Sequence, residues 1–385
     1  MSDTVSQAAL RDAVLPTYAR ADVTFVRGEG CRVWDDEGRS YLDFGTGIAV
    51  AGLGHVHPEV TAAAHAQLDE LWHASNLYWT EPMLRLAALL SDRFGGAQAF
   101  FCNSGAEANE AALKVARKAT GRTRVVALEG GFHGRTLGAL SATGQPSKWE
   151  GFGPLVPGFA FARPNDVESL EASVAPGGEL AAIMLEPIVG EGGVIPLEEG
   201  FVQAAAEIAR EVGALFVLDE VQTGTGRTGT FFAYEQLGVR PDLVTLAKGL
   251  GNGLPIGALL VREGAADAIG PGDHGSTFGG NPVACAAACA VVEAIDEALL
   301  ANVVARGAQL AAGLGALPGV NEVRGRGLLL AGVLDREAAP IVDACRELGL
   351  IVLTAGPDVL RLLPPLVVTE SEVDEALGVL AEALA

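Results

Sequence analysis

The sequence is poor in basic residues. Its 26 lysines and arginines stand against 48 aspartates and glutamates, which gives a formal net charge of -22 at pH 7. Binding to nucleic acid needs clustered lysine and arginine, and so does binding to an anionic membrane surface. We therefore expect neither nucleic acid nor a membrane as a partner. The acidic surface of a soluble enzyme is the simplest interpretation of the charge.

Paired cysteines and long apolar runs are also missing. The five cysteines are scattered and form no C-x-x-C motif, so we expect buried free thiols and no metal site. The first residues, MSDTVSQAALRDAV, lack a basic region followed by an apolar one, and we expect no secretion signal there. Apolar runs such as LAAIML are far shorter than a membrane span. Together these absences predict a cytoplasmic location.

Short, almost wholly apolar runs recur along the middle of the chain. We expect strands at residues 99–103, 124–130, 180–187, 213–220, 242–248 and 256–261. Runs that are apolar throughout are typical of strands buried on both faces of a parallel sheet. Helical segments such as EGFVQAAAEIAREVG lie between them. The pattern predicts an α/β fold, with a large, mostly parallel sheet flanked by helices.

The two ends of the chain have a different texture. We expect residues 1–54 and 283–385 to form a smaller α+β domain, and residues 55–282 to form the large domain. In the tail, Thr369 and Glu372 have the spacing of a capping box, which predicts a helix start.

Polar residues follow several predicted strands, where ligands collect in sheets of this kind. Ser104 and Glu107 have capping-box spacing at the start of a helical pattern. The small residues between them would offer free N–H groups to a phosphate. Phe132 and Arg135 follow the next strand, where an aromatic ring could stack on a ligand and an arginine could bind a carboxylate.

Two further strands end on an acid and on an amine. Asp219 ends one apolar run, and a buried carboxylate there needs a positive partner such as a protonated pyridine nitrogen. Lys248 ends another, and a desolvated lysine can form a Schiff base. Together with the phosphate-binding N–H groups after Ser104 and the ring of Phe132, these features predict pyridoxal phosphate as the cofactor.

Residues 224–229, GTGRTG, fit the G-x-G-x-x-G spacing of dinucleotide loops. Such a loop follows its strand directly and leads into an amphipathic helix, with an acidic residue about 20 positions later. Here four residues intervene after Asp219, and TFFAYEQLG is a poor crossover helix. We interpret the segment as a tight loop, and an NAD-dependent dehydrogenase is the alternative hypothesis from a different class.

Six motifs in a fixed order carry a family resemblance. FFCNSGAEANEAALKVAR, GFHGRT, EPIVGEGG, LDEVQTGTGRTG, TLAKGLGNGLPIGA and GSTFGGNP resemble the class-III pyridoxal-phosphate aminotransferases, and among them the acetylornithine type. The resemblance runs from Tyr18 to the C-terminus. It implies the fold-type-I architecture of these transferases, with pyridoxal phosphate as cofactor and a homodimer with shared active sites.

The resemblance implies roles around the cofactor ring. Lys248 would hold the cofactor, and Asp219 would pair with its ring nitrogen. Gln222 would lie near the ring hydroxyl, and Phe132 would stack on the ring.

Other roles concern the cofactor phosphate. Gly105 and Ala106 would bind it through backbone N–H groups. Thr277 would reach the phosphate of the cofactor in the partner subunit. Many relatives have threonine where this chain has Ala106, so a hydroxyl contact would be missing here.

The remaining implied roles concern the substrates. Arg135 and Ser276 would hold the carboxylate of acetylornithine, and Arg361 would bind the α-carboxylate of 2-oxoglutarate or glutamate. Glu191 would neutralise Arg361 while an ω-amine is bound. Tyr18 corresponds loosely to a tyrosine that contacts substrate in ornithine-type relatives, and its role stays open.

The implied reaction transfers the terminal amino group of N2-acetyl-L-ornithine to 2-oxoglutarate, a step of arginine biosynthesis. Succinylornithine, succinyl-diaminopimelate, ornithine and 4-aminobutyrate are alternative amines, because the residues at the reacting end are shared. A non-catalytic binding protein on the same fold is a third hypothesis, which the presence of Lys248 and Asp219 disfavours.

Overall fold

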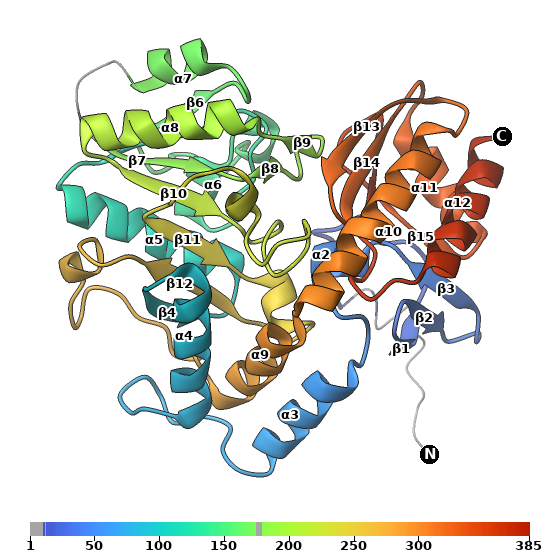
Figure 1. Ribbon diagram of the computed structural model, residues 1–385, viewed down its shortest axis with the longest axis horizontal. Helices are drawn as coiled ribbons and strands as arrows, with labels where there is room; N and C mark the ends of the chain where they lie inside the picture. The colour runs from blue at the N-terminus through green and yellow to red at the C-terminus, as the bar shows by residue number, and fades with distance from the viewer. Residues whose placement is uncertain (1–10, 12, 175–178) are drawn as a thin grey trace.

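A computed structural model describes residues 11, 13–174 and 179–385. Most of residues 1–14, on which the expectation of no secretion signal rests, lie outside these described residues. Figure 1 shows a large sheet covered by helices beside a smaller body formed by the two ends of the chain.

The large sheet has seven strands. Their order is β4 (Gln98–Cys102), β12 (Gly257–Val261), β11 (Leu243–Leu246), β10 (Leu215–Asp219), β7 (Leu180–Leu185), β5 (Arg124–Leu128) and β6 (Phe159–Ala162). Only β12 runs antiparallel to its neighbours. The predicted mostly parallel sheet is confirmed, and so are all six predicted strands. The prediction missed β6, a four-residue edge strand that is only partly buried.

Helices cover both faces of this sheet, as predicted (Figure 1). Side chains alternate between the faces of a strand. In β10, Val217 shares a core with α5 (Gly105–Thr120), whereas Phe216 and Leu218 share one with α8 (Glu199–Val212). The other helices of this part are α3 (Pro58–Leu68), α4 (Glu81–Phe94), α6 (Leu137–Ala142), α7 (Val167–Val174) and α9 (Pro282–Ala294). The sheet is thus buried on both sides, which explains its apolar strands.

The smaller body joins the head of the chain to its tail. One sheet has the order β1 (Phe25–Glu29), β2 (Arg32–Asp35), β3 (Ser40–Asp43), β15 (Leu350–Ile351), and β3 pairs in parallel with β15. The other has the order β13 (Val320–Arg326), β14 (Leu329–Leu334), β17 (Val359–Leu362), β16 (Leu353–Thr354). Its helices are α10 (Glu297–Gly315), α11 (Ala338–Glu347) and α12 (Glu370–Leu384). The boundaries 1–54, 55–282 and 283–385 remain a proposal. Helix α9 spans the second boundary and packs against α3 and α4.

Two helices of the smaller body test features expected from the sequence. α12 begins with the predicted capping box, in which Thr369 and Glu372 each accept the other's backbone N–H. α10 is long and apolar enough by length and composition to cross a membrane. It packs instead against β13, β14 and α12, with Val303, Leu310 and Leu314 buried in their shared core.

Candidate active site

A cavity of about 550 Å³ lies at the carboxyl ends of the parallel strands. Its walls come from the residues that follow β4, β5, β7, β10 and β11, the position where ligands bind in open α/β sheets. Of the predicted site residues, the lining includes Gly105, Ala106, Phe132, Arg135, Asp219, Gln222 and Lys248. The structure therefore brings together the predicted phosphate-binding turn, the aromatic ring, the acid and the amine, which are far apart in the sequence.

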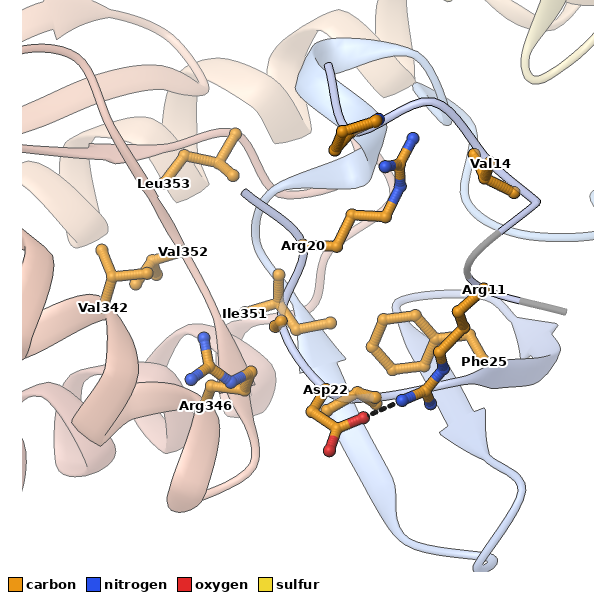
Figure 2. A pocket seen from close by; sticks show the side chains of 13 residues that line it. Arg11, Val14, Arg20, Asp22, Phe25, Val342, Arg346, Ile351, Val352 and Leu353 are labelled. Carbon is orange, nitrogen blue, oxygen red and sulfur yellow. Dashed lines mark hydrogen bonds and ion pairs between the residues drawn. The ribbon is translucent and has the colours of Figure 1, made fainter. Parts of the chain in front are cut away.

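A larger hollow of about 730 Å³ lies elsewhere, between the N-terminal segment and α11 (Figure 2). Its lining is mainly apolar, with Arg20, Arg346 and an ion pair between Arg11 and Asp22. It contains none of the predicted site residues, so its size does not make it the candidate site.

The predicted phosphate-binding segment, called the cradle, is the first turn of α5, which begins at Gly105. Ser104 Oγ accepts the Glu107 N–H at 3.2 Å, as predicted, but the Glu107 carboxylate accepts the Asn103 N–H at 2.5 Å rather than that of Ser104. The predicted capping box is therefore only half correct. The first N–H groups of a helix have no acceptor within it, so those of Gly105 and Ala106 remain available to an anion.

Steric crowding explains the glycine in this turn. A Cβ on Gly105 would lie 2.7 Å from a methyl carbon of Val221, closer than carbon atoms can pack. The glycine therefore lets the cradle sit directly against the loop that follows Asp219. The two free N–H groups, the positive end of the α5 dipole and this close approach fit a phosphate group.

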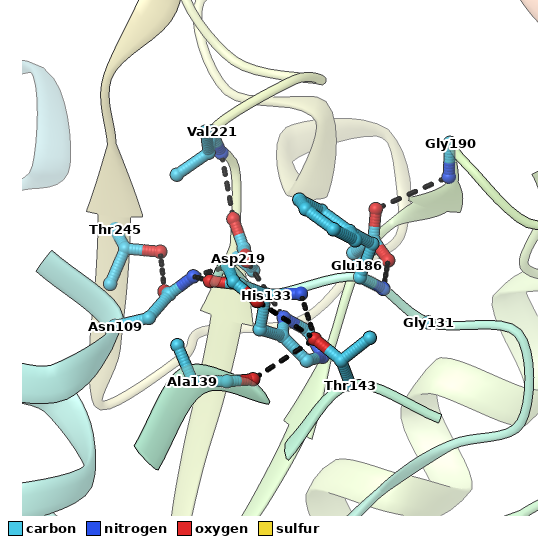
Figure 3. A network of polar contacts seen from close by, with 12 residues as sticks. Asn109, Gly131, His133, Ala139, Thr143, Glu186, Gly190, Asp219, Val221 and Thr245 are labelled. Carbon is cyan, nitrogen blue, oxygen red and sulfur yellow. Dashed lines mark hydrogen bonds and ion pairs between the residues drawn. The ribbon is translucent and has the colours of Figure 1, made fainter. Parts of the chain in front are cut away.

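Asp219 is the centre of a buried hydrogen-bond network (Figure 3). Its side chain is 3% exposed, and Oδ2 accepts from Asn109 Nδ2 and from His133 Nδ1, both at 2.7 Å. Oδ1 accepts the Val221 N–H at 3.0 Å. Asn109 is fixed in turn, because its Oδ1 accepts from Thr245 Oγ1 at 2.8 Å. The network holds the carboxylate at the end of β10 in one orientation.

The network also acts on the pKa of His133. Burial alone would lower the pKa of His133, but the hydrogen bond and charge of Asp219 outweigh burial and raise that pKa. Neither His133 nor Asn109 was among the site residues predicted from the sequence. Asn109 could have been identified because it is a polar residue on the otherwise apolar face of α5.

Lys248 begins the short helix η3 (Lys248–Gly251) with a φ of 46°, a backbone conformation that is unusual for a residue other than glycine. Such strain is concentrated at functional sites. Burial lowers the pKa of Lys248, and the charges of Glu191 and Asp219 offset part of this effect. Among the described residues, its amine has no hydrogen-bond or ion-pair partner. The amine is thus disposed to lose its proton.

The predicted pair of Glu191 and Arg361 is present. Arg361 Nη1 lies 2.7 Å from Glu191 Oε1 and also donates to Gln222 Oε1 at 3.2 Å. Burial would raise the pKa of Glu191, but the charge of Arg361 outweighs it and lowers that pKa. Arg361 Nε is buried without a partner in the described part of the chain. Glu191 therefore engages one nitrogen of the guanidinium, while a second nitrogen has no acceptor in the described part of the chain.

Phe132 and Arg135 lie together at the cavity, with the guanidinium carbon 5.5 Å from the ring centroid. Ser276 and Thr277 do not line the cavity. Ser276 Oγ accepts from Asn103 Nδ2 at 3.2 Å, and Thr277 is exposed. Tyr18 is also exposed and lies outside the cavity lining.

The G-x-G-x-x-G segment is a series of turns followed only by the short 3-10 helix η2 (Ala233–Gln236) and not by an α-helix, so the interpretation as a tight loop is confirmed. Arg227 from this loop is buried and donates to the carbonyl oxygens of Leu328 and Pro364. The loop thus packs against the smaller body instead of forming a dinucleotide site.

Comparisons with known proteins agree with this geometry. Residues 16–384 match the family described as aminotransferase class-III. A protein named acetylornithine aminotransferase from Gloeobacter violaceus is 51% identical, over 97% of this chain and 96% of its own length.

Two solved structures are similar along nearly the whole chain. N-acetylornithine aminotransferase from Stenotrophomonas maltophilia K279a is 41% identical with a TM-score of 0.83, and the match covers 95% of this chain and 96% of that one. Ornithine aminotransferase from Toxoplasma gondii, described with partial occupancy of PLP at its active site, is 35% identical with a TM-score of 0.93, covering 98% and 93% of the two chains.

Proposed function

Since this chain belongs to the class-III aminotransferases, we propose that it transfers the terminal amino group of N2-acetyl-L-ornithine to 2-oxoglutarate. The products are N-acetyl-L-glutamate 5-semialdehyde and L-glutamate, which places the reaction in arginine biosynthesis. The observation that carries the two-substrate chemistry is the Glu191–Arg361 pair next to Gln222 of the cavity. The names of the relatives above select acetylornithine among the possible amines.

Pyridoxal phosphate is the cofactor, and when bound it supplies an aldehyde for the amine and a protonated ring that withdraws electrons from the reacting carbon. The residues present fit it, since the cradle of α5 suits a phosphate and Asp219 suits a ring cation. We assign Lys248 to hold the cofactor, Asp219 to its ring nitrogen and Gln222 to the neighbourhood of its hydroxyl. Gly105 supplies a phosphate contact.

Three further assignments complete the cofactor site. The Ala106 N–H is the second contact to the phosphate, and the Phe132 ring covers one face of the cofactor ring. Once released, Lys248 Nζ takes the proton that leaves the carbon bearing the transferred amine. The lowered pKa of Lys248 favours the unprotonated amine that this step needs.

The Glu191–Arg361 pair would let one site accept two unlike substrates. An ω-amine needs its terminal carbon at the reacting position, with no carboxylate beside it, whereas glutamate brings an α-carboxylate there. When Glu191 pairs with Arg361, the positive charge is neutralised and the first kind of substrate is favoured. When a carboxylate ligand displaces Glu191, Arg361 can bind it. Arg135 and Ser276 would hold the carboxylate of acetylornithine.

We also propose a homodimer in which Thr277 reaches the partner subunit's cofactor phosphate. Exposed apolar side chains lie in the segment of Thr277 and in a second one: Phe278 is its chain neighbour, and Leu71, Trp72, Leu77, Tyr78 and Trp79 lie between residues 71 and 79. Asn76 of the second segment donates to the carbonyl oxygen of Ser276 at 2.8 Å, so the two segments are connected. Apolar surfaces of this kind mark protein–protein contacts.

A cytoplasmic location completes the proposal. All five cysteines are buried free thiols. Free thiols are typical of a reducing compartment.

The first test is the visible absorption spectrum of the purified protein, recorded before and after N-acetylornithine is added without a keto acid. We expect a yellow band that the amine bleaches. A yellow protein that acetylornithine leaves unchanged and that another ω-amine bleaches would refute the proposed substrate. A protein that stays colourless after incubation with pyridoxal phosphate would refute the proposed chemistry altogether.

A further inference from the structure

Glu186 is a buried carboxylate of the cavity that the proposed chemistry does not use. It follows β7 directly and is 5% exposed. Its Oε1 accepts the Phe132 N–H at 2.8 Å, and its Oε2 accepts the Gly190 N–H at 3.2 Å (Figure 3). The two oxygens therefore bind different loops. Oε1 binds the loop that contains Phe132, and Oε2 binds the loop that leads into Glu191.

A carboxylate is an expensive group to bury at this position. Burial raises the pKa of Glu186 to about 7, with the charge of His133 lowering it and that of Asp219 raising it. A buried carboxylate that lacks a cation at hydrogen-bond distance needs other hydrogen bonds to offset the cost of burial. The two oxygens of Glu186 provide these bonds, because each accepts a separate N–H group. The amide of glutamine has only one acceptor atom and cannot do the same.

The two loops that Glu186 joins also touch through their backbones. A Cβ on Gly192 would lie 2.4 Å from the carbonyl oxygen of Gly130, so only glycine lets the loops approach this closely. Gly131 is near as well, since a Cβ there would lie 3.7 Å from Glu186 Oε1. A displacement of one loop would therefore be transmitted to the other.

We propose that Glu186 is a positioning residue that fixes the Phe132 loop against the Glu191 loop, and so couples retention of the cofactor to the choice between substrates. The second half of this inference rests on the proposed function, because it assigns the Glu191–Arg361 pair to substrate choice. The first half concerns cofactor binding alone.

The test is Glu186→Gln, a change that keeps size and one acceptor but loses the other. The dissociation constant for pyridoxal phosphate, measured by titrating the apoprotein and following tryptophan fluorescence, should rise about tenfold, as expected for one lost hydrogen bond to a charged group. The ratio of half-reaction rates for glutamate and acetylornithine should also shift by about tenfold, towards glutamate. The reason is that a less firmly held Glu191 leaves Arg361 more available.

Glu220→Gln is the matched control. Glu220 is also fully buried, burial raises its pKa to about 7, and its two oxygens accept the N–H groups of Ala233 and Tyr234, both at 2.9 Å. It does not line the cavity. We expect Glu220→Gln to lower the melting temperature as much as Glu186→Gln does, with the cofactor affinity and the substrate ratio unchanged. If both variants lose only stability, Glu186 is merely structural and the proposal is overturned.

A measurement on the unaltered protein covers the case in which Glu186→Gln does not fold. Hydrogen exchange of residues 130–133 and 188–192 is compared with and without added pyridoxal phosphate. The coupling requires that exchange slows in both segments on binding, although only the first is expected to touch the ring. Protection confined to 130–133 would overturn the proposal. Neither this readout nor the cofactor titration depends on acetylornithine being the substrate, so a failure of the proposed function would be recognised separately.

Discussion

Replacing Glu191 by glutamine tests how the site distinguishes its two substrates. The change removes the negative charge that faces Arg361 and keeps an oxygen that can accept from Nη1, now 2.7 Å from the carboxylate. The Arg361 side chain is 3% exposed and that of Glu191 is 25% exposed. A neutral amide does not neutralise the positive charge of Arg361, so a carboxylate ligand should displace the glutamine side chain more easily than it displaces Glu191.

The size of the effect follows from the strength of the contact. A hydrogen bond between charged groups contributes about 1.5–3 kcal/mol, which corresponds to roughly 10- to 150-fold in a rate ratio. Because solvent reaches a quarter of Glu191, we expect the lower end of that range, about tenfold. The preference should move towards glutamate and away from acetylornithine.

The assay is the single half-reaction with each amine alone, followed by the loss of the visible absorption band. The ratio of the half-reaction rates with the two amines does not depend on the amount of active protein. Glu207→Gln is a suitable control, since Glu207 forms an exposed ion pair with Arg210 outside the cavity lining. If Glu191→Gln leaves the ratio at its original value, or moves it towards acetylornithine, the switch hypothesis is wrong.

Three further predictions concern separate parts of the molecule. Asp219→Asn should lower kcat by about 10²- to 10³-fold, the range for losing one preorganised electrostatic contact, and near-normal turnover would remove Asp219 from the mechanism. Gly105→Ala should weaken binding of pyridoxal phosphate in a fluorescence titration, because the added methyl would meet Val221 at 2.7 Å; Gly200→Ala, where nothing lies within 4 Å, should not. Burial raises the pKa of Glu220 to about 7, so its contribution to stability is fully present below its unfolded pKa near 4.5 and is lost as the pH rises through 7. Thermal melts should therefore show a pH dependence of about 3 kcal/mol between pH 4.5 and 7 that Glu220→Gln removes, and an unchanged dependence would contradict the assignment.

The sequence predicted those features of the site that depend on local pattern. Each apolar run marked a strand, and the polar residue at its end marked a wall of the cavity, which is how Asp219 and Lys248 were found. This works because the carboxyl ends of parallel strands share one edge of the sheet, whatever the lengths of the connections. Strand β6 escaped because it is short and partly exposed at the sheet edge.

The partners of these residues could not be predicted in the same way. Asn109 lies on a helix face that otherwise reads as small and apolar, and only the packing of α5 on the sheet brings it to Asp219. Glu186 directly follows β7, but its proposed role depends on two backbone N–H groups in other loops. The Glu107 carboxylate accepts the Asn103 N–H and not the Ser104 N–H that the capping-box spacing predicted. In each case the deciding acceptor or donor is set by geometry that residue spacing does not encode.

The distribution of charges in the site explains why Lys248 is the group that can act as a base. Asp219 accepts hydrogen bonds from His133 and Asn109, and Glu191 forms an ion pair with Arg361, so each of these acids already has a donor. A lysine bonded to either carboxylate would be held as an ammonium ion and could not take up a proton. Burial lowers the pKa of Lys248, and the charges of Glu191 and Asp219 offset only part of this effect, because neither carboxylate forms an ion pair with the amine. The ion pairs around the lysine therefore contribute to the chemistry indirectly, because they withhold a counter-ion from its amine.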